Sequence, residues 1–104
     1  MKIVKVTYTV KPEYAEQNQI NIKNVMDDLQ QINHPGINYN ACLGADGVSF
    51  THTAFFNSEG DQQLLNELPS FKIFQEQLKA GGLDTPPKQE LLMLVGSSVN
   101  IFSA

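Results

Sequence analysis

The chain has 104 residues, a formal net charge of -4 and a hydrophobic content of 41%, which is ordinary for a water-soluble globular protein. A nucleic acid or an anionic membrane would each require a basic face, so the acidic balance argues against both partners. The cationic residues are all lysines, so the bidentate arginine clamps that hold phosphate or carboxylate groups are missing.

The cysteine content and the first residues of the chain indicate the cellular compartment. Cys42 is the only cysteine, which rules out an internal disulfide and favours a reducing environment. Lys2 leads directly into a strand pattern, and no apolar stretch reaches the length of a membrane span or a signal core. We therefore expect a single cytoplasmic domain over residues 1–104.

Residues 2–10 alternate as a strand does, and one face carries Val4, Val6, Tyr8 and Val10. Pro12 then stands where a helix favours its first residue. An apolar stripe predicts an amphipathic helix from there to about Asn33, and its members are Ala15, Ile22, Val25, Met26, Leu29 and Ile32. His34-Pro35-Gly36 ends this helix, because proline disfavours helix in the preceding residue and glycine permits the turn.

Asp46-Gly47 is typical of a two-residue β-hairpin turn. Such a turn fixes the register, and the core face then carries the cross-strand pairs Ala45–Val48, Leu43–Phe50, Ala41–His52, Tyr39–Ala54 and Ile37–Phe56. The reverse face is polar apart from Phe55, with Asn38, Asn40, Cys42, Thr51 and Thr53.

The rest of the chain predicts two helical segments and a last strand. Ser58 and Asp61 have the spacing of a capping box that opens a helix through Leu68, and Pro69-Ser70 breaks it. A second helical segment, with Phe71, Phe74 and Leu78 on one face, runs to Gly81-Gly82. Residues 83–88 then predict an extended connection, and residues 90–102 a long strand that is apolar on both faces over residues 91–95.

This order predicts a βαββαβ unit of the α+β class, in which helices cover one face of a four-stranded antiparallel sheet. A strand of about a dozen residues exceeds the usual five or six. Because both its faces are apolar, something must cover the excess. A second copy of the chain is the simplest cover, so we expect a homodimer.

Residues 55–74 carry a resemblance to a known family, in Phe55-Phe56-Asn57-Ser58-Glu59, Leu64-Leu65 and Pro69-Ser70-Phe71-Lys72-Ile73-Phe74. With this spacing the chain resembles the dimeric α/β-barrel superfamily, and within it the antibiotic biosynthesis monooxygenase-like proteins. The resemblance implies ferredoxin-like subunits that pack sheet against sheet, with a cavity between sheet and helices in each. Some members oxidise polycyclic aromatic compounds without metal or flavin, and others degrade haem.

The chain departs from the members that oxidise aromatic compounds or degrade haem, whose polar residues commonly include tryptophan, arginine or a haem-ligating histidine. It has no arginine, no tryptophan and no histidine in residues 64–68. We therefore expect no haem. The two histidines are 18 residues apart with no carboxylate at ligand spacing, so no metal site is predicted. The glycines form neither a dinucleotide fingerprint nor a phosphate loop, so no cofactor of any kind is expected.

His52 is the candidate catalytic base. It lies mid-strand on the core face opposite the small Ala41, which leaves room for a ligand, and its pKa range suits deprotonation of a phenol or enol. A buried histidine that only hydrogen-bonds the backbone or Tyr8 is the alternative. The candidate substrate-binding residues are Tyr8, Asn18, Tyr39, Phe50, Phe71 and Phe74. Asn18 interrupts the apolar side of the first helix, where it either lines a pocket or lies at its boundary.

The leading functional hypothesis is a small-molecule pocket protein with cofactor-independent monooxygenase-like or isomerase-like activity on a hydrophobic, oxygenated compound. The alternative is a non-enzymatic ligand-binding or assembly module of the same fold. A polar-lined cavity that reaches His52 favours the enzyme. A core filled by Phe50, Phe56, Phe71 and Phe74 favours the module.

Overall fold

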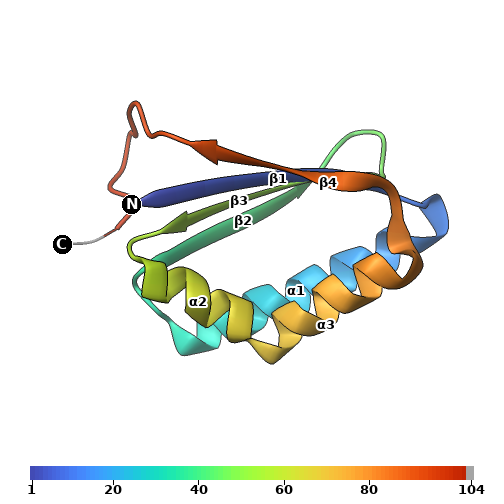
Figure 1. The fold of residues 1–104 in the computed structure, drawn as a ribbon, viewed down its shortest axis with the longest axis horizontal. Helices are drawn as coiled ribbons and strands as arrows, with labels where there is room; N and C mark the ends of the chain where they lie inside the picture. The colour runs from blue at the N-terminus through green and yellow to red at the C-terminus, as the bar shows by residue number, and fades with distance from the viewer. Residues whose placement is uncertain (103–104) are drawn as a thin grey trace.

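Residues 1–102, which the computed structural model describes, form four strands and three α-helices in the order βαββαβ (Figure 1). The elements are β1 (Lys2–Val10), η1 (Pro12–Tyr14), α1 (Ala15–Ile32), β2 (Ile37–Leu43), β3 (Ser49–Phe56), α2 (Glu59–Glu67), α3 (Pro69–Gln77), η2 (Leu78–Gly82) and β4 (Leu83–Leu92). The short elements η1 and η2 are single helical turns that join α1 and α3 to the strands on either side.

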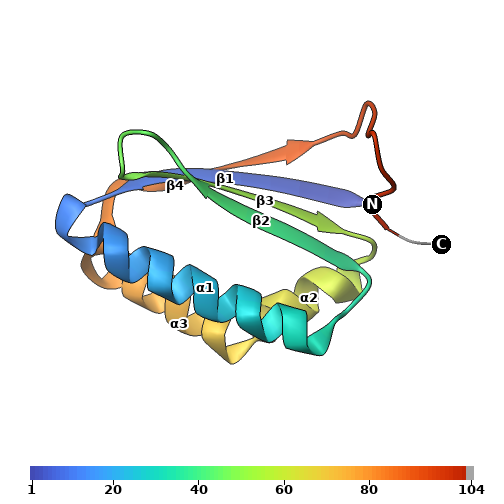
Figure 2. The same ribbon diagram turned by 180° about the vertical axis from the view of Figure 1, so that it is seen from behind.

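The strands form one antiparallel sheet in the order β2-β3-β1-β4. α1 and α3 run side by side along one face of the sheet, and α2 lies at one end of the same layer (Figure 1, Figure 2). None of the described helices covers the other face. This is the predicted ferredoxin-like α+β architecture, with β3 and β1 at the centre of the sheet and β2 and β4 at its edges.

The predicted register of the central hairpin is confirmed. Ala41 lies opposite His52 and Tyr39 lies opposite Ala54 in the β2–β3 ladder. The register places His52 on the helix-covered face, in line with the buried Phe50 of the same strand.

The predicted two-residue turn at Asp46-Gly47 is wrong, because the strands separate one residue earlier on each side. The Gly44 N–H donates to the Ser49 carbonyl at 2.7 Å, and the four residues 45–48 form the loop. The Asp46 carboxylate accepts the Val48 and Ser49 N–H groups, and Gly47 supplies a φ of 78°. Adding one residue to each side of the turn leaves the register unchanged.

The last strand lies earlier in the chain than predicted. β4 spans Leu83–Leu92, whereas the sequence predicted a connection over residues 83–88 and a strand over residues 90–102. β4 pairs with β1, and Leu92 already lies opposite Ile3, so only Lys2 of β1 lies beyond this last pair. Pro86-Pro87 is tolerated because β4 is an edge strand and its pairing is irregular at this point.

Apolar side chains around the end of β4 are exposed. Met93 is 92% exposed and Leu91 67%, and Leu92, Leu94, Val95 and Val99 are also exposed. The predicted strand length was therefore wrong, while the apolar surface that motivated a partner is present in the structure.

The helix boundaries follow local signals in the sequence. α1 ends at Asn33, which adopts a left-handed backbone with φ 52°. α2 opens with the predicted capping box, in which the Ser58 side chain accepts the Asp61 N–H and the Asp61 carboxylate accepts the Ser58 N–H at 2.7 Å. Pro69 is the first residue of α3, so the break between the two helices lies where the sequence placed it.

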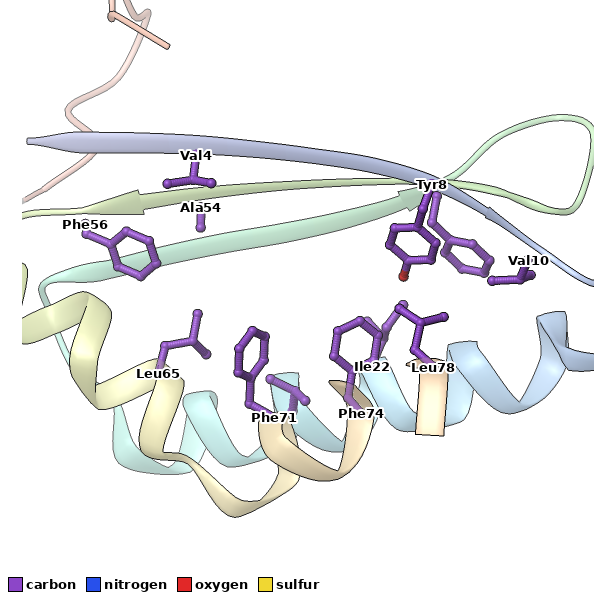
Figure 3. Close-up of a cluster of buried hydrophobic side chains, with 12 residues drawn as sticks. Val4, Tyr8, Val10, Ile22, Ala54, Phe56, Leu65, Phe71, Phe74 and Leu78 are labelled. Carbon is purple, nitrogen blue, oxygen red and sulfur yellow. The ribbon is translucent and has the colours of Figure 1, made fainter. Parts of the chain in front are cut away.

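The core lies between the sheet and the helices. It contains Val4, Tyr8, Val10, Ile22, Val25, Phe50, Ala54, Phe56, Leu65, Phe71, Phe74 and Leu78. Figure 3 shows Phe71 and Phe74 pointing from α3 toward the sheet, while the hydroxyl of Tyr8 points from β1 toward the helices. Aromatic side chains from both layers therefore meet at the middle of the core, with a polar group among them.

Candidate functional site

A row of hydrogen-bonded polar side chains crosses the helix-covered face of the sheet at its middle. His52 on β3 contacts a tyrosine on each neighbouring strand: the Tyr8 hydroxyl lies 2.7 Å from its Nε2, and the Tyr39 hydroxyl 2.5 Å from its Nδ1. Both tyrosines are diagonal cross-strand neighbours of His52, since the residues directly opposite are Val6 and Ala41. The hydrogen bond between His52 and Tyr8 is one that the sequence analysis named for a buried histidine at this position.

The row continues to α1, where the Asn18 Nδ2 donates to the Tyr8 hydroxyl at 2.9 Å. Aromatic rings enclose the row: Phe50 stacks on Tyr8 with ring centroids 5.6 Å apart, and Phe74 lies 5.4 Å from the His52 ring. The four polar side chains thus connect the sheet to the first helix through the core.

Burial sets the protonation states of the row. Loss of solvation lowers the pKa of His52 from 6.5 to about 4, so its imidazole is neutral at neutral pH. Burial likewise raises the pKa values of both Tyr8 and Tyr39 above that of an ordinary phenol. At neutral pH the row consists of uncharged groups that share hydrogen bonds, and none of them is ionised.

A cavity of about 300 Å³ adjoins the row on the side of α3 and β4. Its walls include His52, Tyr8, Tyr39, Phe71 and Phe74. A smaller cavity of about 140 Å³ extends toward α2 and shares His52, Tyr39 and Phe71 with it. The phenylalanines therefore line a hollow beside His52, and they do not fill it.

Two of the predicted site residues lie behind the cavity walls. Asn18, with 0% of its surface exposed, contacts the site through Tyr8, and Phe50 supports the Tyr8 ring from the other side. Ala41 lies opposite His52 as expected, but it lines a separate groove of about 380 Å³ between α1 and β2. We expected ligand space beside His52 on the side of Ala41. This position was wrong, because the void beside His52 opens toward β4.

The sequence did not indicate three polar residues of the cavity wall, Gln75, Lys79 and Gln89. Gln75 follows Phe71 by one helical turn on α3, so the helical spacing in the sequence could have placed Gln75 on the same face as Phe71. Gln89 lies opposite Val6, between the connection and the strand that the sequence predicted, so its side could not be predicted. Among residues 1–102, Lys79 is the one charged side chain in the wall of the 300 Å³ cavity.

A second polar cluster lies at the start of α2. The His34 Nε2 contacts Asp61 Oδ1, and Asp61 Oδ2 accepts the Ser58 N–H and hydroxyl. These hydrogen bonds, with that of His34 foremost, lower the pKa of the Asp61 carboxyl. The sequence predicted His34 only as a helix-end residue, whereas it joins the α1–β2 turn to the start of α2.

Neither cluster has the composition of a metal site. Within residues 1–102, no group of three or more histidine, cysteine, aspartate or glutamate side chains is placed to hold a metal ion. In the same part of the chain, none of the helices is both long and apolar enough to span a membrane.

Neither a protein-family model nor a curated protein sequence matches the chain. Solved structures do match over nearly its whole length. One is an antibiotic biosynthesis monooxygenase, with a TM-score of 0.76 at 13% identity, covering 92% of this chain and 100% of its own.

Two further matches are proteins provisionally named antibiotic biosynthesis monooxygenases. The one from Nitrosomonas europaea has a TM-score of 0.75 at 16% identity, covering 90% of this chain and 89% of its own. The one from Deinococcus radiodurans has a TM-score of 0.71 at 20% identity, covering 99% and 100%. The chain thus shares the ferredoxin-like fold of the antibiotic biosynthesis monooxygenase-like proteins, as the sequence resemblance indicated.

Proposed function

We propose that the protein binds an apolar, oxygenated small molecule in the cavity beside His52. The observation that carries this proposal is the Tyr8–His52–Tyr39 row along the wall of a 300 Å³ cavity. Ligand sites in proteins combine a mostly apolar concave wall with a few convergent polar groups, and this cavity has that combination.

The wall favours a particular ligand chemistry. Phe71, Phe74 and Leu78 offer an apolar floor that suits a planar ring system. Tyr39 and the amides of Gln75 and Gln89 offer hydrogen bonds to oxygen atoms. Lys79 adds a positive charge at the wall, so a phenol or enol that ionises on binding is favoured over a cationic compound.

The finer proposal is that the protein oxidises such a ligand with O2 and without a cofactor, as a monooxygenase. With anthrone as the substrate, one O2 is consumed, one oxygen atom becomes the new carbonyl, and the other leaves as water with the two methylene hydrogens. The reaction begins with loss of a proton to form the enolate. His52 receives that proton at Nε2 through the hydroxyl of Tyr8, which lines the cavity and lies 2.7 Å from that nitrogen.

The low pKa of His52 limits which substrates fit this chemistry. An imidazolium with a pKa of about 4 is about six pKa units more acidic than an ordinary phenol, which corresponds to about 8 kcal/mol for the proton transfer. The substrate is therefore an acidic enol or phenol whose anion Tyr39 and Lys79 stabilise. The same pKa favours the second candidate, a non-enzymatic ligand-binding module in which His52 stays neutral throughout.

Binding and oxidation are tested separately. Anthrone is titrated into the protein while backbone amide NMR signals are followed, and O2 uptake and anthraquinone formation are then measured. Val6→Phe fills the cavity and should abolish binding, whereas Ala41→Leu fills only the groove between α1 and β2 and should leave binding intact. Binding without O2 uptake above the spontaneous rate selects the non-enzymatic module. Equal affinity of the wild type and Val6→Phe contradicts the site.

We also propose that the chain forms a homodimer, supported by the exposed apolar residues that include Leu91, Met93 and Val95. Light scattering at micromolar concentration should give about twice the monomer mass of 11.5 kDa. Leu94→Asp should weaken the dimer, because an unpaired carboxylate in an interface costs several kcal/mol. A monomer mass across the whole concentration range would contradict the proposal. Visible absorbance and elemental analysis of the same sample test the expectation of no haem, flavin or metal.

A further inference from the structure

Asn18 is the member of the hydrogen-bonded row that comes from α1, and it is completely buried. It lies in the first turns of α1 with 0% of its surface exposed, and its Nδ2 donates to the Tyr8 hydroxyl. Its Oδ1 has no hydrogen-bond partner among the described residues. A fully buried amide with an unsatisfied oxygen is costly, so its presence in the core needs a reason.

The amide orientation follows from the cost of the two choices. With Nδ2 toward Tyr8, one carbonyl-type oxygen is left unsatisfied. With the amide turned over, a nitrogen that carries two hydrogens would be left there. Buried donors without a partner are rarer than buried acceptors with unused lone pairs, so the first orientation is favoured.

That orientation determines where each proton of the row lies. The Tyr8 oxygen accepts from Asn18, and the one acceptor in reach of the Tyr8 proton among residues 1–102 is the His52 Nε2. His52 is neutral, so its single ring proton is then on Nδ1 and points to the Tyr39 oxygen. The proton of Tyr39 has no acceptor in the described part of the chain, and Tyr39 lines the cavity.

We propose that Asn18 is a positioning residue that orients the whole row, so that Tyr39 donates a hydrogen bond into the cavity and selects ligands with an acceptor oxygen there. The ligand part of this inference depends on the proposed binding function, whereas the orientation of the row does not. A carbonyl or enolate oxygen placed at Tyr39 satisfies the donor that the row presents to the cavity.

The tautomer of His52 tests the orientation directly. Two-bond ¹H–¹⁵N correlation spectra of the histidine rings at neutral pH should show the Nδ1–H form of His52 in the wild type. Tyr39→Phe should keep that form, because Tyr8 still donates to Nε2. Asn18→Leu should lower the population of the Nδ1–H form, since the Tyr8 proton is no longer directed toward His52. A merely structural role of Asn18 would leave the tautomer unchanged.

An Nε2–H form in the wild type overturns the inference, and so does a pure Nδ1–H form in a folded Asn18→Leu variant. If Asn18→Leu does not fold, the wild type and Tyr39→Phe still decide, because reversed hydrogen bonds would give the Nε2–H form in the wild type.

A matched ligand pair tests the selection. 2-Acetylnaphthalene has a carbonyl where 2-isopropenylnaphthalene has a methylene group of similar shape. The wild type should bind the ketone about five-fold more tightly, which is the usual worth of one hydrogen bond, and Tyr39→Phe should bind both equally. Equal binding in the wild type overturns the selection by Tyr39. If neither compound binds, the proposed cavity function fails, while the tautomer result stands on its own.

Discussion

The two histidines of this chain belong to two polar clusters that differ in almost every physical respect. His52 lies in the core, 5% exposed, between two tyrosine hydroxyls and beside a cavity. The side chain of His34 is 31% exposed and pairs with a carboxylate at the junction of a turn and a helix. The first cluster contains only neutral groups at neutral pH, whereas the second contains an ionised aspartate.

The difference shows that burial, more than residue type, decides what a histidine can do. In the core, the imidazole is kept neutral and both nitrogens are shared, so it can relay a proton or fix a hydrogen-bond pattern. At the junction, water is close and the histidine supports a capping carboxylate. The two clusters should therefore respond to acid in separate pH ranges.

The largest expected effect is the loss of stability that His52 causes in acid. Its pKa falls from 6.5 to about 4 on folding, so the unfolded chain binds a proton in this range that the folded chain excludes. The free energy of unfolding should therefore decrease as the pH drops from 6.5 to 4, by about 3 kcal/mol in total. Urea unfolding at a series of pH values measures this decrease, and His52→Gln should remove it.

His34→Gln is the matched control, because it removes the other histidine and should keep the decrease between pH 6.5 and 4. Parallel curves for the wild type and His52→Gln would show that His52 is not kept neutral by burial, and the contrast between the clusters would then be lost.

The first cluster was largely predictable from the sequence. The hairpin register followed from alternation around Asp46-Gly47, and it was unaffected by the longer loop, so Ala41, Tyr39 and His52 were placed correctly. The ferredoxin-like architecture, which the sequence predicted, pairs β1 with β3 and so brings Tyr8 to His52. What could not be predicted was the open side of the cavity, because it depends on β4. That strand was misplaced, since its apolar residues continue past the point where β1 ends.

The second cluster was only half predictable. The capping box between Ser58 and Asp61 is local, and its spacing predicted it. His34 lies 27 residues before Asp61, and the contact depends on how the α1–β2 turn meets the start of α2. The periodic spacing of apolar and polar residues carries no information about how two loops contact each other. Gly36 was a sequence signal for this contact, because its position beside Asp61 leaves no room for a side chain.

Gly36→Ala should give the next largest effect and disrupt the second cluster alone. A Cβ at this position would lie 2.5 Å from the Asp61 carboxylate, which is held by Ser58 and His34 and cannot move without losing those hydrogen bonds. Overpacking of this kind costs about 1–3 kcal/mol. Urea unfolding at neutral pH measures the loss. The His52 tautomer should not change, and a change there would show that the two clusters are coupled.

The smallest expected effect is that of His34→Gln at neutral pH, because the contact with Asp61 is partly exposed to solvent and glutamine retains an N–H donor for Asp61. The informative measurement is made in acid. The pKa of the Asp61 carboxyl is held below its usual 3.8, chiefly by His34, so the stability this carboxylate contributes is complete above pH 3.8 and is lost as the pH falls through its folded pKa. In His34→Ala, which removes the donor, that pKa should rise toward 3.8, and the acid loss should begin at a higher pH than in the wild type. Carbon-detected NMR of the Asp61 carboxyl follows this titration residue by residue. An unchanged Asp61 titration in His34→Ala would mean that Ser58 alone stabilises the carboxylate, and His34 would then have no electrostatic part in the second cluster.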